Sequence, residues 1–297
     1  MKTERMNVGS AKLVYSIFGE GRVGVVIETG LGSCMAEWWH IAERLSQYHT
    51  VLLYERAGCN LSSKSSLKRT PETIARELKT LLSLLDHNEK LVLIGHAQGG
   101  LYVQQFARLY PDQLKGVILI DPLTAMNDRF KEMLTPEEFK KCGIDALSRI
   151  KENIMKTRLG FMHKAKSALL YDDAAFSPEA KAYILRSYKK LNTLTTARQE
   201  HILSHDESLI QNLKHKEGFP NIPLVLITHS SDTAVREMMA FGADKQLAQK
   251  VEDFAQALIK TYLSFSTQSV LMQAKRSGNQ LHLTEPELIE DALKQIG

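Results

Sequence analysis

The sequence predicts an α/β protein with a mostly parallel sheet and helices on both faces of that sheet. Short, continuous apolar runs, such as VLLY at 51–54 and VILI at 117–120, are typical of strands that are buried on both faces. Helical patterns with three-to-four spacing separate these runs, and strand–helix alternation of this kind produces parallel sheets. Among the 297 residues, 43% are hydrophobic and 24% are charged, which is typical of a globular chain.

The first half of the chain contains five of the predicted strands. Residues 11–18 alternate and end at Gly19 and Gly21, which predicts a half-buried strand followed by a hairpin turn. Thr70 followed by Pro71 predicts the start of a helix, because proline is favoured at the first helical position. The other elements expected in this half are strands at 24–28, 51–54, 91–94 and 117–120 and helices at 38–45 and 99–109.

The pattern changes after Pro122, where a long segment without a convincing strand begins. This segment has helix-like stretches at 136–156, 161–171, 178–191 and 194–213. Alternation then resumes with strands at 224–227 and 269–273 and helices at 234–262 and 285–296. We therefore expect residues 1–124 and 219–297 to form the core and residues 125–218 to form an inserted helical cap. The cap would cover the carboxyl edge of the sheet, where ligands bind in open α/β folds.

Composition excludes several classes of function. The 38 basic and 34 acidic residues give a net charge of only +4, too little for a nucleic-acid interface. No apolar run approaches the ~18 residues of a membrane span, and no secretory signal is expected at the N-terminus. Three cysteines without metal-ligand spacing predict neither disulfides nor zinc, and they favour a cytoplasmic location. No pattern specifies an oligomeric state.

The segment LVLIGHAQGG at 91–100 contains the most specific motif of the chain. A strand, a Gly-x-x-x-Gly turn and a helix form the layout of a nucleophile elbow, a sharp turn that requires small residues on either side of its centre. In hydrolases the central residue is Ser, and its oxygen lies at a helix N-terminus that favours negative charge. In this chain the central residue is Ala97.

With this turn, the chain resembles the α/β-hydrolase fold superfamily, in its capped, esterase-like branch, from about residue 11 to residue 296. The other motifs that carry the resemblance are ETGLGS at 28–33 (the oxyanion loop), Trp38 or Trp39 (the aromatic residue after it), YERAG at 54–58 (the Asp-Arg-x-Gly turn) and IDP at 120–122 (the strand end before the cap). The resemblance implies an eight-stranded sheet.

The resemblance also implies the residues of a binding site. The backbone N–H groups of Leu31 and Gln98 would form the oxyanion hole, and Gly30, His96 and Trp38 would line the pocket. No metal and no cofactor is implied. The expected partner is therefore a small-molecule substrate or ligand beneath the cap.

The acid and the base of a catalytic triad are placed by the same resemblance. The acid belongs after the first strand beyond the cap, where Asp232 occurs, although Asp121 lies at a known alternative position. The base is usually seven residues before the proline that opens the last helix, and counting back from Pro286 gives Asn279. A shift of this loop would instead bring His282 into the base position.

These residues predict a hydrolase site with little or no turnover. The methyl group of Ala97 cannot attack a carbonyl, and Asn279 cannot accept and return a proton near neutral pH. Losing the nucleophile or the base of a Ser-protease triad costs about 10⁶ in turnover. We therefore expect a protein built to hydrolyse a small ester, lactone or amide but catalytically impaired. Natural loss of catalysis and a deliberate inactivating substitution both fit.

Three alternatives remain open at the level of the sequence. The chain could be a non-catalytic small-molecule receptor, carrier or scaffold on the same fold. It could instead perform a lyase or cofactor-free reaction with His282 or His96 as the base. Finally, Cys34 lies close to the expected oxyanion loop and could replace the missing nucleophile.

Overall fold

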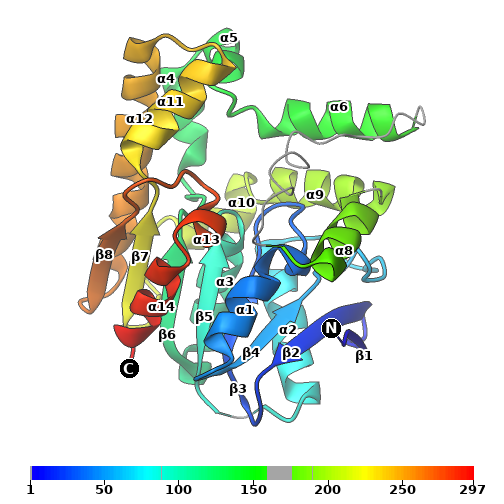
Figure 1. Ribbon diagram of the computed structural model, residues 1–297. Helices are drawn as coiled ribbons and strands as arrows, with labels where there is room; N and C mark the ends of the chain where they lie inside the picture. The colour runs from blue at the N-terminus through cyan, green and yellow to red at the C-terminus, as the bar shows by residue number, and fades with distance from the viewer. Residues whose placement is uncertain (1, 88, 159–175, 189) are drawn as a thin grey trace.

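The computed structural model describes residues 2–87, 89–158, 176–188 and 190–297 (Figure 1). Its centre is an eight-stranded sheet in the order β1-β2-β4-β3-β5-β6-β7-β8. The strands are β1 (Glu4–Asn7), β2 (Lys12–Phe18), β3 (Val23–Glu28), β4 (Thr50–Tyr54), β5 (Leu91–His96), β6 (Leu114–Ile120), β7 (Leu224–Thr228) and β8 (Ser269–Gln273). The pairs β1–β2 and β2–β4 are antiparallel and all others are parallel, which confirms the predicted fold class.

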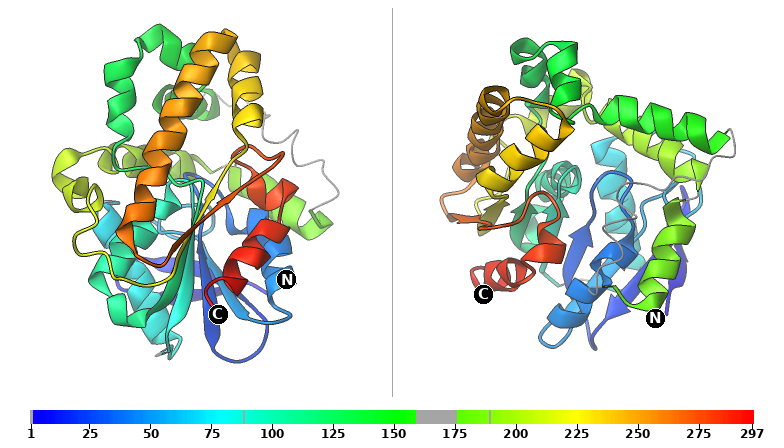
Figure 2. Two further views of the ribbon diagram at one scale, coloured as in Figure 1. Left: turned by 90° about the vertical axis from the view of Figure 1, so that its left-hand side faces the viewer. Right: turned by 45° about the horizontal axis from the view of Figure 1, so that its top comes forward.

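Helices cover both faces of this sheet (Figure 2). Val92 and Ile94 of β5 join an apolar cluster that contains α1 (Trp39–Leu45) and α14 (Glu287–Lys294). Leu91 and Leu93 of β5 join a second cluster that contains α2 (Pro71–Leu84) and α3 (Gly99–Leu109). Neighbouring residues of one strand are thus buried on opposite faces, which explains why the central strands are apolar without alternation.

The N-terminal strands differ from the sequence prediction in two ways. The hairpin expected at Gly19 and Gly21 is wrong, because β2 pairs with β1 and β4 while β3 lies beyond β4. The physical reason is burial: β3 is apolar on both faces and takes a central place between two parallel strands, whereas β2 has exposed positions and lies nearer the edge. The polar edge strand β1 was not predicted.

The segment between β6 and β7, which we call the inserted segment (residues 121–223), contains only helices in its described part. They are α4 (Phe130–Met133), α5 (Pro136–Lys141), α6 (Ala146–Arg158), α8 (Pro178–Tyr188), α9 (Leu191–Leu203) and α10 (Glu207–Ile210). The predicted stretch 136–156 is two helices, because Gly143 has a φ of 68° and ends the first. The stretch predicted at 161–171 lies outside the described residues.

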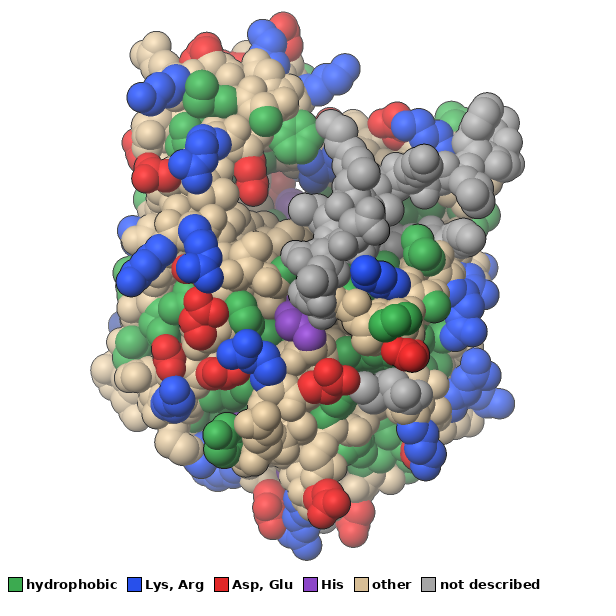
Figure 3. Space-filling model, in the orientation of Figure 1, with side chains coloured by type: hydrophobic (Ala, Val, Ile, Leu, Met, Phe, Trp, Pro, Cys, Tyr) green, Lys and Arg blue, Asp and Glu red, His purple; other side chains and the backbone are tan. Residues whose placement is uncertain are grey.

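The predicted helix 234–262 is also two helices, α11 (Ser231–Phe241) and α12 (Lys245–Lys260), separated by Gly242 with a φ of 118°. They pack with α4 and α5 around a separate apolar cluster that includes Phe130, Val235 and Val251. We call α4, α5, α11 and α12 the helical lobe; it stands above β7 and β8 in Figure 1. Acidic and basic side chains are interspersed on its surface (Figure 3).

Short helices complete the chain. They are η1 (Met35–Trp38), η2 (Pro111–Gln113), η3 (Asn127–Arg129), η4 (Gln211–Leu213), η5 (Thr261–Phe265) and α13 (Leu281–Thr284). Thr70 caps α2 as predicted, since its side chain accepts a hydrogen bond from the Thr73 N–H and Pro71 is the first helical residue. None of the described helices is both long and apolar enough to cross a membrane.

Candidate active site

The carboxyl ends of the parallel strands bring the candidate residues to one edge of the sheet. Strands β3, β5 and β6 end at Glu28, His96 and Ile120, directly before the loops that carry Gly30, Ala97 and Asp121. Because parallel strands share their carboxyl edge, residues far apart in the sequence meet there. This edge is the candidate active site.

The turn at Ala97 has the geometry of a nucleophile elbow. Ala97 directly follows β5 and has a φ of 48°, a left-handed conformation that costs a non-glycine residue about 1–2 kcal/mol. The neighbouring glycines are required by close packing: a Cβ on Gly95 would lie 2.8 Å from the Cα of Gly100. A Cβ on Gly99 would lie 2.7 Å from the carbonyl oxygen of Thr29. The strained turn is therefore present although its central residue has no side-chain oxygen.

The expected oxyanion residues lie beside this turn. A Cβ placed on Gly30 would lie 3.6 Å from the Cβ of Ala97, so the loop after β3 contacts the elbow. No described residue accepts a hydrogen bond from the backbone N–H of Leu31 or from that of Gln98. Both donors are therefore available to an oxygen atom of a ligand.

Asn279 lies next to Asp121. The side-chain Nδ2 of Asn279 donates a hydrogen bond of 2.7 Å to Oδ2 of Asp121. Asp121 follows β6 and, like Ala97, has a left-handed φ, here 43°. The carbonyl oxygen of Asn279 accepts a hydrogen bond of 2.9 Å from Nε2 of His96, the residue before Ala97. The structure thus brings Asn279, Asp121 and the elbow together.

A second hydrogen-bonded chain extends from Asp121 in the other direction. Oδ1 of Asp121 accepts from Nδ1 of His229 at 2.5 Å, and Oε2 of Glu252 accepts from Nε2 of the same ring at 2.9 Å. Burial opposes the charged form of His229, but Asp121 and Glu252 outweigh it and raise the pKa of His229 to about 10. Burial likewise opposes the Asp121 carboxylate, but His229 and Asn279 hold its pKa below the usual range. The imidazole is therefore a cation that donates from both nitrogens.

Asp232, the residue expected to be the acid, lies elsewhere. It is exposed in the first turn of α11. Within the described residues, no hydrogen bond joins Asp232 to Asn279 or to His282. The structure does not bring Asp232 together with Asn279, the residue at the expected base position; Asp121 is the carboxylate that Asn279 contacts.

His282 is buried in an aromatic cluster. Its ring stacks on Trp38, with centroids 4.2 Å apart and an angle of 8° between the planes, and it meets the ring of His96 at 5.2 Å. Neither ring nitrogen of His282 has a hydrogen-bond partner among the described residues. Burial, with smaller effects of His96 and His40, lowers the pKa of His282 well below its usual value. His282 is thus a neutral packing partner of Trp38 in this structure, and Trp38 is fully buried.

The other candidate groups are less suited to reaction. Cys34 is fully buried, and burial together with the charges of Glu55 and Glu37 raises the pKa of its thiol well above the usual value. This environment disfavours the nucleophilic thiolate. The described residues contain no group of three or more His, Cys, Asp or Glu side chains that could hold a metal ion.

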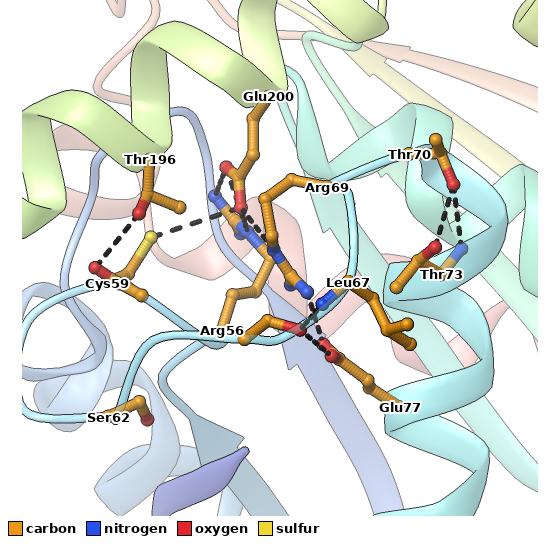
Figure 4. A network of polar contacts seen from close by, with 12 residues as sticks. Arg56, Cys59, Ser62, Leu67, Arg69, Thr70, Thr73, Glu77, Thr196 and Glu200 are labelled. Atoms are coloured by element: carbon orange, nitrogen blue, oxygen red, sulfur yellow. Dashed lines mark hydrogen bonds and ion pairs between the residues drawn. The ribbon is translucent and has the colours of Figure 1, made fainter. Parts of the chain in front are cut away.

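The buried guanidinium of Arg56 pairs with Glu200 (Figure 4) and also contacts the loop after β3. Arg56, in the loop after β4, donates to the carbonyl oxygens of Thr29 at 2.8 Å and of Gly30 at 2.9 Å. It also pairs with Glu28 at 2.6 Å and with Glu200 of α9 at 3.0 Å. A cation that is almost fully buried is thereby compensated by two buried carboxylates.

The sequence did not reveal the roles of His229, Glu252 and Glu200. His229 directly follows a buried strand at the ligand-binding edge, and this position was the one available signal. Glu252 and Glu200 lie on helices in which a glutamate is an ordinary residue, and no spacing connects them to their partners. Their contacts with His229 and Arg56 are seen only in the three-dimensional structure.

Comparisons with known proteins agree with this architecture. Residues 24–146 match a family model described as the alpha/beta hydrolase fold. The uncharacterized protein YqjL of Bacillus subtilis (strain 168) is 24% identical over 278 residues, which cover 94% of this chain and 85% of YqjL.

Solved structures resemble the whole chain. A probable hydrolytic enzyme from Pseudomonas aeruginosa PAO1 superimposes with a TM-score of 0.71 at 15% identity, covering 99% of this chain and 93% of that chain. The epoxide hydrolase CorEH gives a TM-score of 0.68 at 18% identity, covering 99% of this chain and 97% of that chain. Strand order, elbow turn and these similarities define a protein of the α/β-hydrolase fold.

Proposed function

We propose that this chain is a catalytically impaired α/β-hydrolase that binds a small ester, lactone or amide, or a related carbonyl compound. In this proposal Leu31 and Gln98 donate their backbone N–H groups to the ligand oxygen. Ala97 stands in the place of the nucleophile, Asn279 in that of the base, and Asp121 in that of the acid. The proposed cap, residues 125–218, encloses the ligand, and the three free, buried cysteines are compatible with a cytoplasmic location.

The hydrogen bond between Asn279 and Asp121 is the observation that carries this proposal. In a working triad the acid accepts a hydrogen bond from the base and orients it toward the nucleophile. The Asn279 amide makes the equivalent bond, at 2.7 Å, beside an elbow that keeps its strained backbone. An imidazole at residue 279 would have the same acceptor available. The arrangement supports a triad frame whose nucleophile and base are absent.

A non-catalytic receptor or carrier is the second candidate. The N–H groups of Leu31 and Gln98, which have no acceptor among the residues that the structure describes, favour it, because binding of a carbonyl oxygen needs no nucleophile. The two candidates differ in what restoration of the missing groups achieves: a dormant hydrolase regains turnover, and a receptor with a different ligand does not.

The test is the double substitution Ala97→Ser, Asn279→His, assayed with p-nitrophenyl acetate. In a Ser-protease triad, loss of the nucleophile alone costs as much as loss of all three residues. Each single substitution is therefore expected to stay near the unsubstituted chain, and the double variant to exceed it by about 10³-fold or more in kcat.

The unsubstituted chain and the two single variants are the matched controls, and each must keep the circular dichroism spectrum of the parent. A folded double variant without gain would contradict the dormant hydrolase. The receptor would then be supported by thermal stabilisation of the unsubstituted chain by the same class of small carbonyl compounds.

A further inference from the structure

We infer that Glu200, on helix α9 of the inserted segment, orients the oxyanion donor of Leu31 through Arg56. The inference deepens the proposed function, because it rests on Leu31 as a ligand-binding group. It makes Glu200 a positioning residue: it touches no ligand itself, and it acts through the guanidinium and the backbone of the loop after β3.

The first step is the geometry of one peptide bond. The carbonyl oxygen of Gly30 and the N–H of Leu31 belong to the same peptide unit, which is planar and trans. The two groups therefore point in opposite directions, and fixing one fixes the other. Arg56 Nη2 fixes this carbonyl oxygen at 2.9 Å, while Nη1 holds the preceding carbonyl, that of Thr29, at 2.8 Å. A cationic donor at the carbonyl also polarises the peptide and strengthens its N–H as a donor.

The second step is the position of the guanidinium. Nε of Arg56 donates to Oε1 of Glu200 at 3.1 Å, and Nη2 donates to Oε2 at 3.0 Å. The nitrogen that holds the Gly30 carbonyl is thus also held by Glu200, whose side chain is fully buried. Glu28 pairs with the other terminal nitrogen, Nη1, at 2.6 Å. Without Glu200, Nε would lose its acceptor, and Nη2 would lose the contact that sets its direction.

The third step concerns the other oxyanion donor, Gln98. Its side-chain Nε2 donates to the hydroxyl of Tyr102 at 2.6 Å and to Oγ of Ser204 at 3.4 Å. Ser204 is the C-cap residue of α9, and the Arg56 guanidinium lies 5.1 Å from the centre of the Tyr102 ring. Both proposed donors are therefore connected to the C-terminal half of the same helix. In this inference, the position of α9 on the sheet therefore determines the geometry of both proposed oxyanion donors.

The same network contains a matched control. Glu77 of α2 is buried and pairs with Arg69 at 2.7 Å, so it resembles Glu200 in environment and charge. Its other partners are the hydroxyls of Ser10 and Ser65. Among the described residues, none of these hydrogen-bonds to the loop after β3; Arg69 also pairs with Glu200, but at the longer distance of 3.9 Å. A structural role without positioning predicts equal effects of Glu200→Gln and Glu77→Gln on Leu31.

The sequence offers a selective probe for this peptide. Glycine is followed by leucine at only two places, Gly30–Leu31 and Gly100–Leu101. Labelling with ¹³C′-glycine and ¹⁵N-leucine therefore gives two signals in an HNCO spectrum. Gly30 ¹³C′ and Leu31 ¹⁵N report on the hydrogen bond from Arg56, and the pair in α3 is the internal reference.

We expect Glu200→Gln to move the Gly30 ¹³C′ and Leu31 ¹⁵N signals upfield, because the hydrogen bond at the carbonyl weakens. Arg56→Lys, whose compact ammonium cannot serve both carbonyls and Glu200 at once, should shift them further in the same direction. Glu77→Gln should leave both signals in place. If Glu200→Gln does not fold, Glu200→Asp, which keeps the charge but withdraws the carboxylate from Nε and Nη2 of Arg56, takes its place with the same expected direction. Gly30 and Leu31 signals that move no more in these variants than in Glu77→Gln would overturn the inference.

The functional readout uses the Ala97→Ser, Asn279→His protein. Because loss of one oxyanion donor costs about 10²–10³-fold in kcat, misorientation by Glu200→Gln should cost about 10–100-fold in kcat, with KM nearly unchanged. Glu77→Gln should change kcat less than about twofold. If this protein has no esterase activity, the proposed function fails, whereas the spectra of the unsubstituted chain still decide the positioning role.

Discussion

The two sides of the elbow turn differ in what they retain. In the proposed function, the oxyanion side (Gly30, Leu31, Gln98 and Arg56) has two backbone N–H donors without an acceptor among the described residues, and a buried cation whose terminal nitrogens are both bonded. In the same proposal, the proton-transfer side (Ala97, Asn279, Asp121 and His229) has the elbow backbone and Asp121 as its acid, with an alanine and an amide at the proposed positions of the nucleophile and the base. Under this proposal, the groups that position a carbonyl oxygen are separate from the groups that move a proton, so one set can be present without the other.

The largest expected effect identifies the acid of the proton-transfer side. In the Ala97→Ser, Asn279→His protein, Asp121→Asn should lower kcat by about 10⁴-fold, as loss of the triad acid does elsewhere. Asp232→Asn is the matched control and should change kcat less than about twofold, because Asp232 is exposed on α11. Esterase kinetics measure both. A large loss of kcat in Asp232→Asn together with a small one in Asp121→Asn would identify Asp232 as the acid.

The second largest expected effect is a loss of stability when the buried ion pair between Arg56 and Glu200 is broken. Glu200→Ala leaves the Arg56 cation buried with only one carboxylate, and such a loss typically costs about 3–5 kcal/mol in the free energy of unfolding. Glu72→Ala removes an exposed ion pair with Arg76 in the first turn of α2 and should cost less than about 1 kcal/mol. Urea denaturation measures the two changes. Equal losses would show that the buried pair does not hold α9 on the sheet.

The His229 ion pairs should make the proton-transfer side sensitive to alkaline pH. A folded-state pKa of about 10, raised from 6.5, means that the stabilisation by His229 is fully present below pH 6.5 and is lost as the pH rises to about 10. The stability advantage of the unsubstituted chain over His229→Gln should therefore be a few kcal/mol at pH 6 and should fall by up to about 1.4 kcal/mol per pH unit above pH 6.5.

The control for this pH series is His215→Gln, at an exposed position. Its free energy of unfolding should stay within about 0.5 kcal/mol of the parent at every pH. Denaturation curves between pH 6 and pH 10 measure both variants. A pH-independent difference for His229→Gln would show that the ring is not charged between Asp121 and Glu252.

The smallest expected effect concerns the strain at the elbow. Ala97→Gly relieves a left-handed penalty of about 1–2 kcal/mol and adds about 0.5–1 kcal/mol of unfolded-state entropy, so a net stabilisation between zero and about 1.5 kcal/mol is expected. Ala107→Gly, inside α3, should instead destabilise by about 1 kcal/mol. Thermal denaturation compares the two. A destabilising Ala97→Gly would mean that the methyl group packs rather than merely replaces a hydroxyl.

Much of the fold could be predicted because burial leaves a recognisable pattern of apolar residues in the sequence. The apolar runs of β3 to β7 and the glycines around Ala97 each follow from a local requirement, either a doubly covered strand or a close approach of two backbones. The short strand β1 escaped prediction because the sequence ERMN has three polar residues and lies at the sheet edge. The spatial order of β2, β4 and β3 could not be predicted because strand pairing depends on contacts between residues that are distant in the sequence.

Only those residues of the candidate site that belong to a sequence motif could be predicted. Ala97 and Asn279 were found by their distance from glycine and proline, and the structure brings both to the same edge. Asp121 replaces Asp232 beside Asn279 because the end of β6, rather than α11, faces that loop. Arg56 and Glu200 are 144 residues apart in the sequence. The hydrophobic pattern can predict that a residue is buried, but it does not predict which residue of opposite charge it will contact.

The helical lobe has a consequence for attempts to simplify this chain. Its apolar cluster is shared between α4 and α5, from within the inserted segment, and α11 and α12, which follow β7. Excision of residues 125–218 would strip the inner surfaces of α11 and α12, leaving Val235, Met238 and Val251 in water. The exposed apolar surface would make a trimmed chain of this kind prone to self-association. Helices α4 and α5 of the inserted segment therefore have to be kept together with α11 and α12.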